Sequence, residues 1–155
     1  MTSNERPEET GYFPLFIDLW KKKILVAGAG NIAARRIAVL AQFGADITVV
    51  APEISETVRE LSGRSQINIL CKPYEPDCCK GMYMVLAATD NRELNAKICQ
   101  DGHDEGAIVN NASDKIQCDF YFPGIVKRGA DVIGVNAGGS SHGRARQLRE
   151  RIEKL

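Results

Sequence analysis

The hydrophobic positions of this chain fall into short continuous runs, separated by longer stretches with helical spacing. A continuous apolar run of about four to eight residues is typical of a strand buried on both faces of a sheet. Such runs predict strands at residues 23–27, 46–51, 66–71, 82–88 and 107–110. The spacing between them predicts helices over residues 31–43, 53–61 and 91–103. Strands that alternate with helices indicate βαβ units, so the expected fold class is α/β, a Rossmann-like doubly wound parallel sheet.

After residue 111 the pattern changes to a hairpin and one helix. Residues 119–127 and 131–136 predict two antiparallel strands, and Pro123 favours an edge or a bulge in the first of them. Ser140 or Ser141 can cap the final helix. Its apolar face would carry Ala145, Leu148, Ile152 and Leu155.

These elements predict a leader and two further parts. The leader is residues 1–11, the α/β domain residues 12–112, and a small α+β module residues 113–155. Because a hairpin and a single helix bury little surface, we expect the module to pack on the first domain or on a second subunit.

Composition narrows the class of protein. The chain has 155 residues, 44% of them apolar, which suits one domain with at most a small appendage. Its 20 Lys and Arg residues balance 20 Asp and Glu residues, so a generally basic nucleic-acid binder is not expected. No apolar run approaches the roughly 20 residues of a membrane span. The chain does not begin with an apolar segment like that of a signal peptide, so the expected location is the cytoplasm.

The five cysteines are expected to be reduced thiols. Their number is odd, their spacings do not repeat, and Cys78 and Cys79 are adjacent. The two histidines, His103 and His142, lie far from them in sequence. This pattern favours neither a disulfide framework nor a zinc site, and no metal is expected.

A glycine-rich turn follows the first predicted strand. Residues 28–33 read G-x-G-x-x-A, with Gly28 and Gly30 at the two glycine positions and Asn31 and Ile32 opening the helix. The first glycine permits a tight turn, the second lets the backbone approach a pyrophosphate, and the small third residue lets helix and strand pack closely. The helix N-terminus offers N–H groups to an anion. In its βαβ context the motif predicts dinucleotide binding; the simpler interpretation is a tight turn without a ligand.

The end of the second strand bears on the choice of dinucleotide. An acidic residue there usually holds the ribose hydroxyls of NAD. Here Ala51 occupies the usual place, and Pro52 and Glu53 follow it, slightly late. Arg59 is too far along the next helix to hold a 2′-phosphate, so we expect NAD rather than NADP.

The fourth strand leads into Thr89 and Asp90. Ligands of open α/β sheets bind outside the carboxyl ends of the strands, so both residues are expected to line the cofactor site. The alternative role of Asp90, or of Asn91, is to cap the next helix.

Five segments together resemble one family. They are F-P-L-F-I-D-L at 13–19, V-A-G-A-G-N-I-A-A-R-R at 26–36, A-A-T-D-N at 87–91, C-D-F-Y-F-P at 118–123 and G-G-S-S at 138–141. In this order they resemble the precorrin-2 dehydrogenase family, which includes the first module of multifunctional siroheme synthase. The resemblance implies NAD-dependent oxidation of precorrin-2 to sirohydrochlorin. It also implies a homodimer formed through residues 113–155. Related enzymes often continue into a further helical domain, so the chain is expected to be a short member or a piece of a longer one.

The resemblance also points to candidate catalytic residues. Many members carry an aspartate shortly after the fifth strand, in a pattern like N-x-x-D. Here that position is Ser113, and Asp114 follows. A carboxylate is the natural base for the proton lost on oxidation, whereas a serine without a partner is a poor one. Asp114 could be the base, Ser113 could orient substrate or water, or base catalysis could be unnecessary. Asp119 is a third candidate, better interpreted as a charge at a strand edge.

The implied substrate carries eight carboxylates, so basic groups should surround it. The candidates are Lys115 and Arg144, with Ser141 at a helix N-terminus and His142 beside it. His142 could move a proton or bind iron, but a surface histidine at a helix start is the simpler interpretation. The last helix carries an excess of basic residues, which the acidic leader balances in the net charge of the chain. A solvated helix face would also explain any one of these basic residues.

Two other functions remain open. Some members of the family insert ferrous iron, so sirohydrochlorin ferrochelatase activity, alone or in addition, is one alternative. A non-catalytic NAD(H)-binding redox-sensing domain is the other, since the glycine turn fits it equally well.

Overall fold

The computed structural model describes residues 11–138 and 142–155, which form two compact units. One unit is residues 18–120. The other combines residues 11–17 with the described part of 121–155. The functional division expected at residue 112 remains a prediction, since compactness alone does not assign a function to either part.

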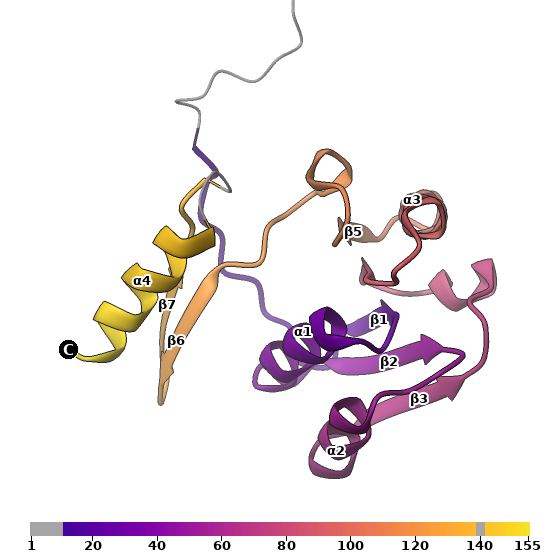
Figure 1. The fold of residues 1–155 in the computed structure, drawn as a ribbon, viewed down its shortest axis with the longest axis horizontal. Helices are drawn as coiled ribbons and strands as arrows, with labels where there is room; N and C mark the ends of the chain where they lie inside the picture. The colour runs from indigo at the N-terminus through magenta and orange to yellow at the C-terminus, as the bar shows by residue number, and fades with distance from the viewer. Residues whose placement is uncertain (1–10, 139–141) are drawn as a thin grey trace, which may run out of the picture. The chain divides into compact units, whose positions relative to one another are not determined.

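Residues 18–120 form the α/β sheet that the pattern predicts. The strands are β1 (Lys23–Ala27), β2 (Asp46–Ala51), β3 (Ile67–Cys71), β4 (Met84–Ala87) and β5 (Ile108–Asn111). The helices are α1 (Asn31–Ala41), α2 (Glu56–Arg64) and α3 (Arg92–Asp104), with short 3₁₀ turns η1 (Pro76–Cys79) and η2 (Lys115–Gln117). All strand pairs are parallel, in the order β3-β2-β1-β4-β5 (Figure 1). The expected Rossmann-like fold class is confirmed.

The strand order places the two halves of the unit on opposite sides of β1. The chain runs outward from β1 to β3 and then returns to β4, so right-handed crossovers put α1 and α2 on one face and α3 on the other. The core beneath α3 is made of fully buried side chains from both layers. They include Leu25, Val85, Val109 and Ile98. Burial on both faces explains why these strands read as continuous apolar runs.

The helix starts differ slightly from the expected ones because capping residues set them. Helix α2 begins at Glu56 rather than residue 53, since the Ser55 hydroxyl accepts a hydrogen bond from the Val58 N–H at 3.4 Å. Helix α3 begins at Arg92, since the Asn91 side chain accepts one from the Leu94 N–H at 3.0 Å. Asn91, and not Asp90, is therefore the cap.

The second unit contains the predicted hairpin and helix. Strands β6 (Gly124–Arg128) and β7 (Asp131–Val135) are antiparallel, and α4 (His142–Glu153) packs on β6. Strand β6 begins only after Pro123, which has no N–H to donate to a ladder. The rings of Tyr12 and Tyr121 meet edge to face, 4.3 Å apart, and join the N-terminal segment to this unit.

Candidate functional site

The carboxyl ends of the parallel strands gather the predicted cofactor and catalytic residues at one edge of the sheet. Gly28 and Gly30 follow β1, Pro52 and Glu53 follow β2, Thr89 and Asp90 follow β4, and Ser113 and Asp114 follow β5. The strand order reverses between β1 and β4, the place where open α/β sheets bind ligands. We call this edge the carboxyl edge (Figure 1).

Gly28 is required by the backbone itself. Its φ of +113° lies in a region that side-chain-bearing residues rarely adopt. A Cβ at this position would overlap the carbonyl oxygen of Ala88, at the end of β4. The Gly28 N–H donates to the Val50 carbonyl at 2.9 Å, so the turn is also anchored to β2. Gly28 therefore lets the loop after β1 pass close to β4.

Gly30 is open on its outer side. It occupies the N-cap of α1 with an ordinary φ of −84°, and no atom of residues 11–138 and 142–155 lies within 4 Å of where a Cβ would be. Among the described residues, no side chain caps this helix, and its first turn holds no acidic residue. The first N–H groups of α1 therefore have no side-chain partner in that part of the chain. Asn31 and Ile32 continue the exposed surface. The turn thus fits a pyrophosphate, which would lie where a side chain at residue 30 would intrude.

The end of β2 supplies the acidic candidate. Ala51 is buried, while Pro52 and Glu53 are exposed. The Pro52 carbonyl accepts a hydrogen bond from the Cys71 thiol at 3.3 Å, so the end of β3 adjoins this loop. Glu53 is therefore the carboxylate available at this point of the carboxyl edge, although its place in the chain is later than usual.

Cys71 gives a direct test of where the dinucleotide lies. Among the five cysteines it is the exposed one, and burial raises the pKa of Cys79, Cys118 and Cys99, the last to about 12. Because the thiolate is the reactive form, a maleimide should modify Cys71 fastest. Saturating NAD is expected to slow this reaction at least about threefold, measured by mass spectrometry, with Cys71→Ser identifying the site. Equal rates with and without NAD would count against a cofactor beside Pro52.

A fully buried asparagine joins the ends of β4 and β5. Asn95, in the first turns of α3, is 0% exposed. Its Oδ1 accepts from the Thr89 N–H at 3.0 Å and from the Thr89 hydroxyl at 2.6 Å. Its Nδ2 donates to the Thr89 carbonyl and to the Ser113 hydroxyl oxygen, both at 3.0 Å. The Thr89 hydroxyl is thus engaged with the protein, while Asp90 is exposed beside it.

Ser113 and Asp114 lie in a loop that closes on itself. The Ser113 hydroxyl and N–H both donate to Asn111 Oδ1, at 2.8 and 2.9 Å. One oxygen of Asp114 accepts from the Ile116 N–H at 3.0 Å and caps η2. The Cys118 sulfur accepts from the Asn111 N–H at 3.2 Å, which holds the two ends of the loop together. Neither Ser113 nor Asp114 is therefore a free-standing side chain.

Asp119, the third candidate base, serves the edge of the sheet. Its Oδ2 accepts from the Val109 N–H at 2.7 Å, and its own N–H donates to the Val109 carbonyl at 2.9 Å. The same oxygen lies 2.9 Å from His103 Nε2. Asp119 thus satisfies backbone groups at the open side of β5, which agrees with its interpretation as a strand-edge charge.

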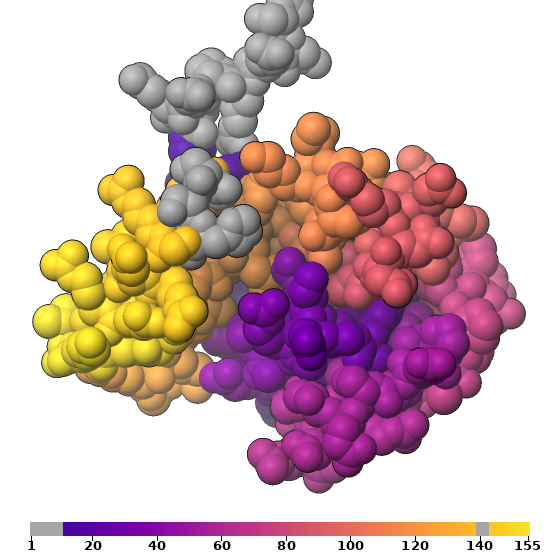
Figure 2. All heavy atoms as spheres, in the orientation of Figure 1, coloured from indigo at the N-terminus to yellow at the C-terminus, as the bar shows by residue number. Residues whose placement is uncertain are grey.

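Of the predicted substrate residues, Lys115 is exposed in η2 at the carboxyl edge. Arg92, which the sequence did not single out, donates to the Ser113 carbonyl at 3.3 Å and lies on the same surface. The atoms of α3 and of the chain after β5 adjoin each other on the upper surface in Figure 2. Two cations therefore lie next to the candidate catalytic loop.

The other predicted substrate residues belong to the second unit. Arg144 is exposed on α4. Ser141 and the His142 side chain lie outside the described residues. Farther along α4, Arg146 pairs with Glu150 at 2.7 Å and Arg149 pairs with Glu153. Such exposed pairs within one helix support the interpretation of that part as a solvated face.

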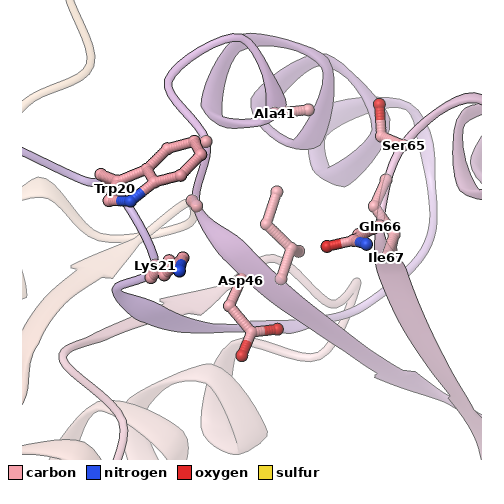
Figure 3. Close-up of a pocket in the computed structure, with 10 residues that line it drawn as sticks. Trp20, Lys21, Ala41, Asp46, Ser65, Gln66 and Ile67 are labelled. Atoms are coloured by element: carbon pink, nitrogen blue, oxygen red, sulfur yellow. The ribbon is translucent and has the colours of Figure 1, made fainter.

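A cavity of about 510 Å³ lies away from these residues. Trp20, Lys21, Asp46, Gln66 and Ile67 are among its lining residues (Figure 3). Asp46 and Ile67 begin β2 and β3, so this cavity is at the amino ends of the strands. It is therefore distinct from the carboxyl edge where the glycine turn lies.

The described residues contain neither a membrane-spanning helix nor a metal cluster. Within residues 11–138 and 142–155, no helix has the length and apolar character needed to cross a bilayer. In the same part of the chain, no group of three or more His, Cys, Asp or Glu residues is arranged to hold a metal ion.

Sequence reasoning missed Asn95, Cys118 and Arg92 as parts of the site. Asn95 follows the fourth strand within A-A-T-D-N-R-E-L-N, but it reads simply as a polar residue in a helix. Its burial within an amphipathic helix depends on contacts with β4 and β5, which local periodicity does not report. Cys118 has no local signal either, because its hydrogen bonds with Asn111 span seven residues.

Known proteins match most of this chain. A family model named NAD_binding_7, with the description "Putative NAD(P)-binding", matches residues 15–124. Siroheme synthase 1 of Pectobacterium atrosepticum is 35% identical over 144 residues, 93% of this chain and 30% of that protein. The probable multifunctional siroheme biosynthesis protein HemA of Ruminiclostridium josui is 40% identical over 146 residues, 94% of this chain and 28% of that protein. The chain therefore spans about three-tenths of the length of these relatives.

A solved structure, that of SirC, precorrin-2 dehydrogenase, superposes with a TM-score of 0.77 at 26% identity. The match covers 92% of this chain and 70% of that one. Together with the glycine turn and the uncapped start of α1, the family model supports the predicted cofactor, NAD. The chain belongs to this family of NAD(P)-binding proteins.

Proposed function

We propose that the chain is an NAD-dependent dehydrogenase that oxidises precorrin-2 to sirohydrochlorin, a step of siroheme biosynthesis. The observation that carries the proposal is the glycine turn before the uncapped N-terminus of α1, in a chain similar to SirC over 92% of its length. The siroheme synthases that match 93% of the chain support the same substrate class.

The residues of the carboxyl edge have distinct parts in this reaction. When bound, NAD supplies the nicotinamide that accepts a hydride from the substrate. The backbone at Gly28, Gly30 and Asn31 would hold the pyrophosphate, and Glu53 the ribose hydroxyls. Thr89 and Asp90 would line the same site. Glu53 favours NAD over NADP, because its negative charge would repel a 2′-phosphate.

Oxidation also releases a proton, for which Asp114 is the candidate base. It is half-buried and uses one carboxylate oxygen to cap η2. Ser113 is less suited, because its hydroxyl already donates to Asn111. Lys115 and Arg92 would attract the carboxylates of the tetrapyrrole, with Arg144, Ser141 and His142 as further candidates from the second unit.

Asp114→Asn is the matched test of the base. Asparagine keeps the oxygen that accepts from the Ile116 N–H, so the loop should persist while the negative charge is lost. We expect kcat to fall about 100-fold, the usual contribution of general base catalysis, with little change in thermal stability. Ser113→Ala is expected to lower kcat less than tenfold. If neither variant slows turnover, the catalytic role of this loop is wrong.

The proposal includes a homodimer located in the cytoplasm. Phe13, Leu15 and Phe16 are 86%, 71% and 75% exposed, and Ile133 in β7 is also exposed. Apolar side chains gathered in one short segment are typical of a surface that another molecule covers, and a second copy of the chain is the proposed partner. Sedimentation velocity should give twice the chain mass; a monomer at micromolar concentration would contradict this.

The function is tested by mixing the purified chain with precorrin-2 and NAD and following the absorbance of sirohydrochlorin. Product formation that requires NAD supports the dehydrogenase. If NAD is bound but no product forms, the redox-sensing alternative becomes the better account. Adding ferrous iron to sirohydrochlorin tests the ferrochelatase alternative.

A further inference from the structure

The hydrogen bonds around Asn95 help to determine where the proton of the Ser113 hydroxyl points. A backbone N–H can only donate, so the end of the Asn95 amide that faces the Thr89 N–H is oxygen. The other end is therefore Nδ2, and it donates both to the Thr89 carbonyl and to the Ser113 oxygen. All four hydrogen-bonding positions of the Asn95 side chain are filled within the protein.

The same argument fixes the group on the other side of Ser113. The Ser113 N–H donates to the Asn111 side chain at 2.9 Å, so that end of the Asn111 amide is oxygen as well. The Ser113 hydroxyl accepts from Asn95 and faces this oxygen at 2.8 Å. Its only proton must therefore point to Asn111. What the Ser113 oxygen keeps is one lone pair, which can accept one more hydrogen bond.

We propose that Asn95 is a positioning residue that fixes Ser113 as a hydrogen-bond acceptor for an N–H group of the substrate. The inference rests on the proposed function, since a tetrapyrrole carries pyrrole N–H donors. Ser113 would then orient the macrocycle at the carboxyl edge and take no proton from it. Asn95 touches neither substrate nor cofactor and acts through Ser113, while its other end holds the loop after β4.

The direct test of this geometry is independent of activity. The two protons of the Asn95 side-chain amide have different partners, the Thr89 carbonyl and the Ser113 oxygen. They should therefore give two distinct NMR signals. In Ser113→Ala, we expect one of these signals to shift and the other to stay within the line width. Ser113 is half-buried, so this variant should fold. If neither signal moves, or both move equally, the assigned polarity is wrong.

The functional test is a double-mutant cycle with Asn95→Asp and Ser113→Ala. Aspartate can still accept from both Thr89 donors, but when ionised it can donate neither to Ser113 nor to the Thr89 carbonyl. Each single variant should lower kcat/KM for precorrin-2 about three- to tenfold. In the double variant the part of the Asn95→Asp effect that acts through Ser113 is already lost, so the two effects should combine to clearly less than their product. The Kd for NAD should stay within about twofold, because both Thr89 donors keep their acceptor. Effects that multiply, or a matching loss of NAD affinity, would overturn the inference.

Asn110→Asp is the matched control. Asn110 is also buried, at 3% exposure, and its Nδ2 donates to the Phe120 carbonyl rather than to Ser113. Its substitution should lower the melting temperature as Asn95→Asp does, yet its effect on kcat/KM should multiply with that of Ser113→Ala. If the unchanged chain has no NAD-dependent activity, the proposed function fails. If activity is present but the Asn95 and Ser113 effects multiply, only this inference fails.

Discussion

Gly30→Ala is expected to abolish most NAD binding while leaving the fold intact. Within the part of the chain that the structure describes, no atom lies within 4 Å of the new Cβ, and the φ of −84° is open to alanine. The methyl group would instead occupy the space assigned to the pyrophosphate. Overpacking of about 1–3 kcal/mol corresponds to a loss of affinity of about 5- to 150-fold. Fluorescence titration with NADH measures it.

The stability of the same variant is the control. Alanine is a poorer N-cap than glycine by about 0.5 kcal/mol, so the melting temperature should fall by only about 2 °C. Unchanged NADH affinity in a folded Gly30→Ala chain would mean that the dinucleotide does not approach this turn.

Gly28→Ala is expected to damage the fold itself. Here the Cβ would overlap the Ala88 carbonyl, and the φ of +113° is strained for any L side chain. The overlap is with backbone at the end of β4 and not with a flexible side chain, so it cannot be relieved locally. We expect a loss of at least about 3 kcal/mol in the free energy of unfolding, or roughly 10 °C in melting temperature.

The pair of variants separates two roles that the motif combines. Both replace a glycine by alanine, two residues apart, and they predict opposite results for stability. Urea unfolding of Gly28→Ala with a midpoint like that of the unchanged chain would show that the close approach between the turn and β4 is not rigid.

The fold was predictable where local pattern and burial agree. The bounds of β1 and β2 match the expected residues 23–27 and 46–51, because continuous apolar runs flanked by polar or turn residues leave little freedom. Helix starts were less accurate, since single hydrogen bonds at Ser55 and Asn91 decide them. The first hairpin strand was expected from residue 119, but Asp119 instead bonds to Val109.

The site was predictable in its glycine turn and less so elsewhere. The turn has a local sequence signature, because one short segment must supply the bend and the helix N-terminus. The Asn95 network has none, because it joins Thr89 to Ser113 through contacts 6 and 18 residues apart in sequence. Asp114 was correctly placed near the end of β5, but its role as the cap of η2 depends on the turn that follows.

An NAD-dependent oxidation at the carboxyl edge of the sheet is the function proposed for this chain. The most direct measurement follows sirohydrochlorin formation from precorrin-2 with NAD, for the unchanged chain and for Gly30→Ala side by side. The predicted result is product from the unchanged chain, and product that forms at least about fivefold more slowly with the variant, both at one NAD concentration well below the Kd of the unchanged chain. No NAD-dependent product from the unchanged chain, or equal rates for both, would contradict it.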